Sequence, residues 1–177
     1  MIYLMNYDSP IGRLLLAERA GALMGLWIEG QKYFPNAWKE EAAVNPKGEA
    51  LQCAAEWLER YFRGRKPSVS ELKIAPEGSE FRRAVWKLLC EIPYGKVVTY
   101  GEIAGKIAAA RGLKSMSAQA VGGAVGHNPI SVIIPCHRVV GTGGKLTGYA
   151  GGLDRKAKLL ALEGAFILPS VPSRETI

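Results

Sequence analysis

Short apolar runs alternate with turn-forming residues at the start of the chain. The segments IYLMNY (2–7), RLLLAE (13–18) and ALMGLWI (22–28) are separated by DSPIG and RAG. Because short strands joined by tight turns pair with their neighbours, this pattern predicts an antiparallel meander. The N-terminus is therefore expected to form a small sheet.

A helix is predicted to cover this sheet. After residues 36–47, which we expect to form a loop, apolar residues recur every three or four positions between Gly48 and Phe62. Gly64 stands where such a helix would end, because glycine readily adopts the left-handed backbone of a helix C-terminus. The segment 64–79 is rich in Pro, Gly and Ser and marks a domain boundary.

This boundary divides the chain into three predicted parts. They are an N-terminal sheet-plus-helix domain over 1–75, a second domain over 79–168 and a tail over 169–177. The predicted class is α/β, in the α+β sense that a small antiparallel sheet with a helix precedes a mostly helical domain. The first domain shows no obvious chemistry, so we interpret it as a scaffold.

The second domain begins with a helix whose start is marked in the sequence. Ser79 is a suitable N-cap, and the helix after it places one apolar face inward. That face consists of Phe81, Val85, Leu88, Leu89 and Ile92. The stretch PYGK (93–96) then turns the chain.

Two further helices, joined by a loop, are predicted between residues 99 and 126. Thr99 and Glu102 form a capping box for a helix that runs to about Ala110, and Ser115 or Ser117 caps the next one, AQAVGGAVG. Two short helices connected in this way indicate a helix-turn-helix.

The second of these helices consists largely of small residues, namely Ala118, Ala120, Gly122, Gly123 and Ala124. Glycine lowers helix stability, so the small surface should serve a purpose. Either it packs tightly against another helix in the core, which composition alone favours, or it lets a ligand approach the backbone closely.

Composition indicates a globular protein, with 48% hydrophobic and 22% charged residues among 177. No apolar run approaches the roughly 20 residues of a membrane helix, and MIYLMNYDSPIGR does not resemble a secretory signal. We therefore expect a cytoplasmic protein without membrane contact.

The net charge of +7 is unevenly distributed along the chain. Residues 1–80 carry 10 Lys and Arg against 11 Asp and Glu, whereas residues 81–177 carry 13 against 5. A basic half attracts polyanions such as nucleic acids or acidic lipid surfaces. The same charge can also serve solubility alone, and the count does not separate these two roles.

The cysteines and histidines are few and far apart. Cys53, Cys90 and Cys136 form no C-x-x-C pair and no disulfide framework, and only His127 and His137 could join them in a metal site. We therefore expect no metal and no cofactor. Cys53 and Cys90 lie in predicted helices and are interpreted as small hydrophobic residues.

Cys136 has a different setting, in NPISVIIPCHRVVG (128–141). The apolar run Ile130–Ile134 is predicted to be a strand that Pro135 ends. A free thiol has a pKa of about 8.5 and needs a base or a cation to ionise at neutral pH. His137 can supply the base, and Arg138 or the local field the positive charge. Neighbours on a strand point to opposite faces, so adjacency alone leaves a reactive cysteine open.

The motif IPCHRVV (134–140) resembles the active-site signature of the O6-alkylguanine-DNA alkyltransferases, the methylated-DNA–protein-cysteine methyltransferases. Four more stretches match the family in the same order: FRRAVWKLL (81–89), IPYGKVVTYGEIA (92–104), AVGGAVGHNP (120–129) and LTGYAGGLDRKAKLLALEG (146–164). The N-terminal half is similar to the variable first domain of that family, mainly through YDSPIGRLLLA (7–17).

The resemblance implies a suicide reaction in which one cysteine takes the alkyl group irreversibly from guanine O6, or from thymine O4. Cys136 would be the nucleophile, and His137 the base, acting through a water. Glu163 would orient His137 and favour its charged form. Asn128 would brace the turn before the active-site segment.

The resemblance also implies how the base is held. Tyr100 would donate to the guanine ring, and the carbonyls of Cys136 and Val139 would accept from its exocyclic amine. The lid GYAGG (148–152) would place Tyr149 against the alkyl group. Ala150 replaces a serine of some members, which removes one hydrogen bond to O6.

For DNA binding, the family implies that the small-residue helix enters the minor groove of double-stranded DNA and that the damaged base is rotated out. Gln119, Ala120 and Gly123 would lie on this surface with Thr99, and we expect the protein to act as a monomer. Gln119 stands where the family usually has an arginine that fills the hole left by the base. It is shorter and uncharged, so Lys114 is a candidate to assist.

Three rival functions remain open. A non-catalytic sensor of alkylguanine would carry tryptophan at the cysteine position, where this chain has Cys136. A transcription regulator would present long polar side chains to the bases, whereas AQAVGGAVG offers only Gln119. A cysteine hydrolase would turn over many times.

Overall fold

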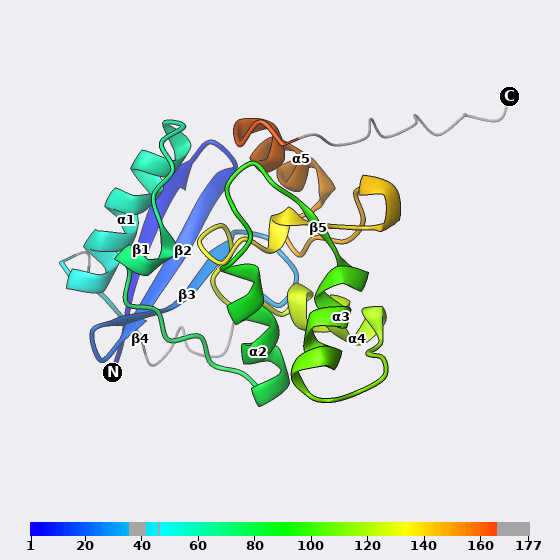
Figure 1. Cartoon of the computed structure of the whole chain (residues 1–177). Coiled ribbons are helices and arrows are strands. Elements are labelled where there is room, and N and C mark those ends of the chain that lie inside the picture. The colour runs from blue at the N-terminus through cyan, green and yellow to red at the C-terminus, as the bar shows by residue number, and fades with distance from the viewer. Residues whose placement is uncertain (36–41, 46, 166–177) are drawn as a thin grey trace, which may run out of the picture.

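The computed structural model describes residues 1–35, 42–45 and 47–165. The three predicted strands form an antiparallel meander, β1 (Ile2–Ser9), β2 (Gly12–Arg19) and β3 (Ala22–Ile28). A fourth strand, β4 (Ala42–Val44), pairs parallel with β1 and gives the order β3-β2-β1-β4 (Figure 1).

The predicted loop at 36–47 is wrong at β4. Three residues are too few to show the period of a strand in the sequence, and their pairing with the edge of β1 determines their conformation. Residues 36–41 and 46 of that predicted loop lie outside the described residues.

Helix α1 (Glu49–Phe62) packs on one face of the sheet (Figure 1). Leu51, Ala54 and Leu58 are buried at their predicted helical spacing. The helix ends at Arg63, and the following Gly64 has φ +78°, which glycine adopts without steric cost.

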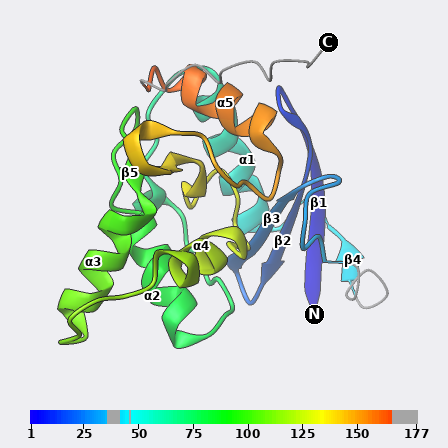
Figure 2. The ribbon, with the colours of Figure 1, turned by 90° about the vertical axis from the view of Figure 1, so that its right-hand side faces the viewer.

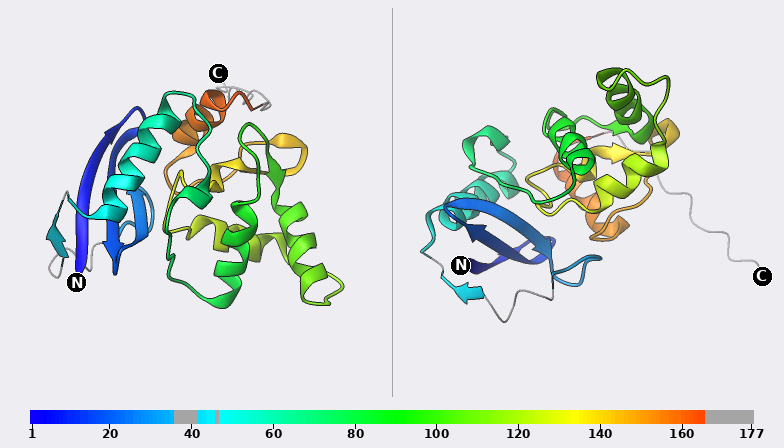
Figure 3. Two further views of the ribbon diagram at one scale, coloured as in Figure 1. Left: turned by 60° about the vertical axis from the view of Figure 1, so that its left-hand side comes forward. Right: turned by 90° about the horizontal axis from the view of Figure 1, so that it is seen from below.

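The segment from residue 80 to residue 165 lies beyond the β3 edge, away from β4 (Figures 2 and 3). It contains the helices α2 (Glu80–Leu89), α3 (Tyr100–Ala110), α4 (Ala118–Gly126) and α5 (Leu153–Leu162). A two-residue pair, β5 (Val98–Thr99) and β6 (Val139–Val140), runs parallel among them. Single 3-10 turns occur at Val69–Glu71, Cys136–Arg138 and Thr142–Gly144. The predicted fold class is confirmed.

The predicted helix starts are also confirmed. The Ser79 hydroxyl accepts from the Arg82 amide at 3.2 Å. Thr99 and Glu102 form the predicted capping box of α3. Of the two serines considered for α4, Ser117 is the cap, and it accepts from the Ala120 amide.

The predicted strand Ile130–Ile134 is wrong. The segment is a succession of turns in which only Ile130 bridges to a strand, at Leu26. The Asn128 side chain folds it, because its oxygen accepts from the Ile130 amide and its nitrogen donates to the Ile134 carbonyl. The run is apolar because it is enclosed on every side, and in sequence such a turn looks like a buried strand.

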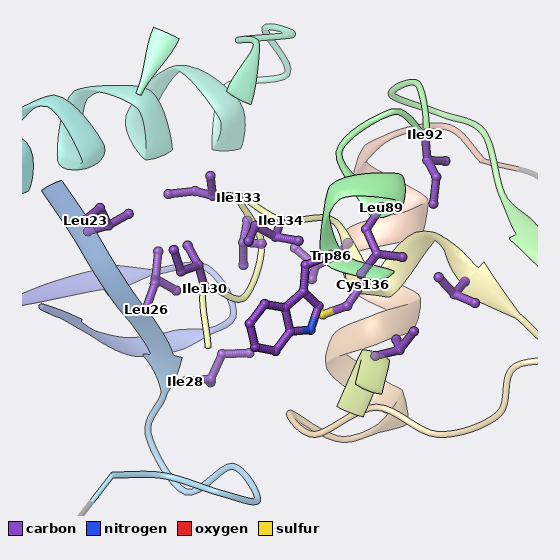
Figure 4. Packing of buried hydrophobic residues seen from close by; sticks show 14 of the residues in the cluster. Leu23, Leu26, Ile28, Trp86, Leu89, Ile92, Ile130, Ile133, Ile134 and Cys136 are labelled. Carbon is purple, nitrogen blue, oxygen red and sulfur yellow. The ribbon is translucent and has the colours of Figure 1, made fainter. Parts of the chain in front are cut away.

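The β3 edge holds this segment in place. The Leu26 amide donates to the Pro129 carbonyl at 2.8 Å, and the Ser131 amide donates to the Leu26 carbonyl at 2.9 Å. Buried side chains of the sheet, α1, α2 and 130–134 belong to one core cluster (Figure 4). The division at 75–79 therefore stays a prediction, and the predicted tail, 169–177, lies outside the described residues.

Candidate active site

Cys136 opens the 3-10 turn that leads into β6. Its side chain is only 5% exposed, yet it lines a pocket of about 170 Å³. In Figure 4 it belongs to the same cluster as Trp86 and Leu89 of α2. The remaining wall of the pocket includes Lys32, Tyr33, Tyr100, Asn128, Tyr149 and Ala150.

The burial of Cys136 determines its protonation state. Burial raises the pKa of the thiol, and this outweighs the Asn128 hydrogen bond and the nearby Lys156 charge, which both lower it. The resting sulfur is therefore protonated at neutral pH. The expectation that Arg138 would supply the positive charge at the thiol is wrong, because its guanidinium binds Glu163 and the Ile92 carbonyl.

His137, the residue after the thiol, forms a buried pair with Glu163. The imidazole Nε2 lies 2.6 Å from Oε1 of Glu163. Bonds from His137 and Arg138 hold the pKa of Glu163 at about 2 despite its burial, so it is ionised and can only accept. Nε2 therefore carries the proton. The other nitrogen, Nδ1, has no hydrogen-bond partner among the described residues.

Glu163 favours the charged form of His137, as expected, but this pull does not decide the charge of the imidazole in the resting protein. Burial lowers the pKa of His137, and the charges of Arg138 and Lys156 act in the same direction against the pull of Glu163. The imidazole is therefore neutral at neutral pH. A neutral imidazole with a free Nδ1 is able to accept a proton.

The other predicted substrate residues divide between the pocket and its surroundings. Tyr100, Tyr149 and Ala150 line the pocket. The Tyr100 hydroxyl donates to the Thr147 carbonyl at 3.0 Å, and the buried Tyr149 hydroxyl has no partner among the described residues. Val139 is fully buried and is not part of the pocket wall.

The Val139 carbonyl accepts a hydrogen bond from a buried lysine. Lys156 of α5 is fully buried, and its ammonium donates to the carbonyls of Val139, Thr147 and Gly148. It thus ties the lid loop to β6. Burial lowers the pKa of Lys156 to about 8, so it remains mostly charged at pH 7. No motif in the sequence marks Lys156, although a lysine on an apolar helix face is a usable signal.

The helix-turn-helix borders a second hollow of about 660 Å³. Thr99, Gln119 and Gly123 contribute to its wall, as do Tyr100 and Gly148, which also line the pocket of Cys136. Ala120 is exposed on the same helix, whereas the exposed Lys114 lines a separate hollow between α3 and the loop before α4.

The small residues of α4 divide between an exposed face and a buried face. Ala118, Ala120 and Gly123 are exposed, whereas Ala124 packs in the core with Val121. Core packing, which composition favoured, therefore accounts for only part of this helix. Its open face allows another molecule to approach the backbone closely.

No three His, Cys, Asp or Glu side chains within the described residues are grouped in a way that could hold a metal ion. The same part of the chain has no helix with the length and apolar character needed to cross a membrane.

Comparison with known proteins gives matches over almost the whole chain. Residues 80–165 match the model of the 6-O-methylguanine DNA methyltransferase DNA-binding domain, and residues 2–76 match the ribonuclease-like domain of the same enzymes. A methylated-DNA–protein-cysteine methyltransferase of Mycolicibacterium paratuberculosis is 48% identical over 165 residues, which cover 92% of this chain and 93% of that protein. One from Methanosarcina barkeri is also 48% identical over 165 residues, covering 90% and 97%.

Solved structures agree with these matches. The crystal structure of Mycobacterium tuberculosis O6-methylguanine methyltransferase has a TM-score of 0.79 at 41% identity and covers 93% of each chain. A structure of Mycobacterium tuberculosis OGT in complex with DNA has a TM-score of 0.79 at 40% identity and covers 92% of each chain. This chain therefore belongs to the O6-methylguanine DNA methyltransferase family, the methylated-DNA–protein-cysteine methyltransferases.

Proposed function

We propose that this protein repairs DNA by moving the alkyl group of O6-alkylguanine onto Cys136, once per molecule. The observation that carries the proposal is that Cys136 lines a pocket and that the next residue, His137, is paired with the buried Glu163. Cys136 lies within residues 80–165, which match the DNA-binding domain model of the family. This match supports a reaction between the thiol and a base of bound DNA.

The thiol must lose its proton before it can attack. Cys136 and His137 are both neutral at rest, so the proton passes from the sulfur to Nδ1, through a water, as the alkyl group approaches. Glu163 accepts from Nε2 and stabilises the imidazolium that results. Burial thus keeps the thiol unreactive until a substrate fills the pocket.

The transfer itself is a displacement at carbon. The thiolate forms an S–C bond as the C–O6 bond breaks, and the electron pair of that bond stays on the guanine, which then takes up a proton. The product is a thioether, whose C–S bond is stable in water, so the protein is consumed. Asn128 serves this step by fixing the turn that holds the cysteine.

Recognition of the base uses the pocket wall. Tyr100 exchanges its bond to Thr147 for one to the guanine ring, and Tyr149 packs against the alkyl group. The Val139 carbonyl accepts from Lys156, and its second lone pair is available to the exocyclic amine. The Cys136 carbonyl accepts from the Val139 amide and likewise retains one lone pair.

The partner is double-stranded DNA that carries an alkylated guanine, bound by a monomer. The exposed small face of α4 fits a minor groove, and Gln119 stands at the start of that helix, beside the hollow that leads to Tyr100. Extrusion of the base costs a few kcal/mol. Thr99 at the start of α3 and Lys114 in the loop before α4 serve as contacts to the DNA backbone.

Intact-mass measurement tests this function. After mixing with duplex DNA that contains O6-methylguanine, the protein is expected to gain one methyl group in place of hydrogen, with at most one group per molecule. Peptide mapping should place it on Cys136. The Cys136→Ala variant should bind the same duplex without gaining mass, and Cys90→Ser should behave as the natural protein.

Each other outcome points to a rival. Binding of the damaged duplex without any mass change in the natural protein would identify a sensor that recognises alkylguanine. Repair of a molar excess of lesions would identify a true catalyst that turns over. A methyl group on Cys53 or Cys90 would overturn the assignment of Cys136.

A further inference from the structure

A tyrosine from the N-terminal part reaches the His137–Glu163 pair. Tyr61 lies in the last turn of α1 and is fully buried. Its hydroxyl donates to Oε1 of Glu163 at 2.7 Å and lies 3.5 Å from Nε2 of His137. Neither the sequence pattern nor the family motifs indicated this contact, because Tyr61 follows Leu58 as an ordinary core residue of the helix.

The Glu163 carboxylate is fully occupied by donors. Oε1 accepts from His137, Tyr61 and Nη2 of Arg138, and Oε2 accepts from Nε of Arg138 and the Gly95 amide. Arg138 balances the charge, so Tyr61 is not needed for neutralisation. Its hydroxyl instead shares the oxygen atom that His137 uses, and it thereby limits both the position and the acceptor strength of that oxygen.

The tyrosine is a fixed donor. Burial and the adjacent Glu163 raise its pKa far above the ordinary value, so the hydroxyl keeps its proton. Its ring is stacked on Trp57, with centroids 5.4 Å apart, and meets Phe62 and Tyr94 edge-on. The hydroxyl therefore cannot move unless α1 moves.

We propose that Tyr61 is a positioning residue for alkyl transfer, through which α1 sets the geometry and basicity of the His137–Glu163 pair. The N-terminal part is then more than a scaffold, since it contributes a side chain to the proton relay. This inference rests on the proposed function of Cys136 and assigns it a further participant.

The consequence is measurable in the pH dependence of transfer. Without the hydroxyl, Oε1 becomes a stronger acceptor for the Nε2 proton, which stabilises the imidazolium and raises the pKa of His137. Protonated His137 cannot take the thiol proton, so the acid limb of the rate profile moves to higher pH. The titratable and charged groups that face His137 and Glu163 are Tyr61, Tyr94, Tyr149, Arg138 and Lys156.

The experiment compares Tyr61→Phe with the natural protein in single-turnover transfer from O6-methylguanine duplex, with protein in saturating excess, across pH 5 to 9. Phenylalanine keeps the ring contacts and removes only the hydroxyl. We expect a transfer rate constant about tenfold lower on the acid limb, because a larger fraction of His137 is already protonated there. We also expect a higher acid midpoint and unchanged affinity for DNA.

Two further variants separate positioning from general packing. Tyr94→Phe removes a neighbouring hydroxyl that donates to the Leu162 carbonyl, one residue before Glu163, and should leave rate and midpoint unchanged. In a Glu163→Gln background, Tyr61→Phe should lower the rate much less than it does alone, because Tyr61 acts through the carboxylate. Additive losses in that cycle would overturn the proposal.

A stronger donor provides a test that does not depend on removing a group. If 3-fluorotyrosine is incorporated at position 61, its more acidic hydroxyl should move the acid midpoint to lower pH. Natural rates and midpoints in both position-61 variants would overturn the role of Tyr61 while leaving the proposed repair intact. Absence of transfer in the natural protein would instead overturn the proposed function.

Discussion

At the scale of single residues, the notable feature is that the two reacting groups are neutral while their support is ionic. Burial raises the pKa of Cys136 and lowers the pKa of His137, so neither carries charge at rest. The ionic contact is made one step further back, between Glu163 and Arg138. This arrangement protects the buried imidazole of His137 from premature charging and holds a carboxylate ready for the imidazolium.

Replacement of Glu163 by Gln tests that support. The amide cannot stabilise an imidazolium, so the single-turnover rate constant should fall about 100-fold or more. Arg138 would be left without its counter-charge, and the free energy of unfolding should fall by about 3 kcal/mol at pH 7. As a control, Glu59→Gln, which breaks only an exposed pair with Arg63, should change neither quantity measurably.

Comparison of Glu163→Gln with the natural protein also tests how the free energy of unfolding depends on pH. The folded pKa of Glu163 is about 2, below its ordinary 4.5, so its stabilising contribution is complete above pH 4.5 and is lost as pH falls toward 2. The difference in unfolding free energy between the natural protein and Glu163→Gln should therefore shrink over this interval in urea titrations. Glu71 and Glu102 also have lowered pKa values, but both proteins retain them. A difference independent of pH would contradict this linkage.

At the scale of elements, the sequence was informative wherever the determining contacts are local. The caps of α2, α3 and α4 were predictable, because each depends on a hydroxyl and an amide three residues apart. The segment 130–134 and β4 were not, because distant contacts determine them: Asn128 with Leu26 for the first, and the β1 edge for the second.

In the candidate site, too, some residues could be predicted from the sequence and others could not. Cys136, His137, Glu163 and Asn128 could be named from motifs in the sequence, and in the structure Asn128 contacts the thiol while His137 contacts Glu163. Tyr61 and Lys156 could not be assigned from motifs, since each sits in a helix whose other inward positions are plain core. The resting charges of Cys136 and His137 could not be predicted, because burial, which the sequence does not show, outweighs the neighbouring charges.

On helix α4, the role of Gln119 in DNA binding can be tested. Gln119 is exposed at the second position of this helix, on the wall of the larger hollow. Gln119→Arg should strengthen DNA binding and steepen the dependence of log affinity on log salt by about 0.9, as expected for one more phosphate contact. The repair rate should rise as base extrusion becomes easier. Fluorescence anisotropy over a salt series and single-turnover kinetics measure both.

The matched control adds the same charge elsewhere. Val44→Arg places it on exposed β4, at the far edge of the sheet from α4 (Figure 3). It should leave the salt dependence and the repair rate as they are. If Gln119→Arg changes neither affinity nor rate, the role assigned to Gln119 is wrong.

At the scale of the whole molecule, the active-site segment is held by both halves of the chain. The β3 edge bonds to 129–131, the Lys32 amide donates to the Ala150 carbonyl at 3.0 Å, and Arg155 of α5 donates to the Ile11 carbonyl. Since Leu58, Trp86 and Cys136 share one core cluster, a loss of packing in the N-terminal part should reach the thiol.

Leu58→Ala measures this coupling. Leu58 is fully buried in α1, and its truncation should lower the free energy of unfolding by about 3 kcal/mol. Hydrogen exchange followed by mass spectrometry should show the same loss of protection in the most protected peptides of β2 and of α2, because a common core unfolds as one cooperative unit. Glu56→Ala on the exposed side of α1 should change neither. A loss confined to β2 would mean that residues 1–75 and 79–168 unfold separately, and the N-terminal part could then hold the active-site segment only loosely.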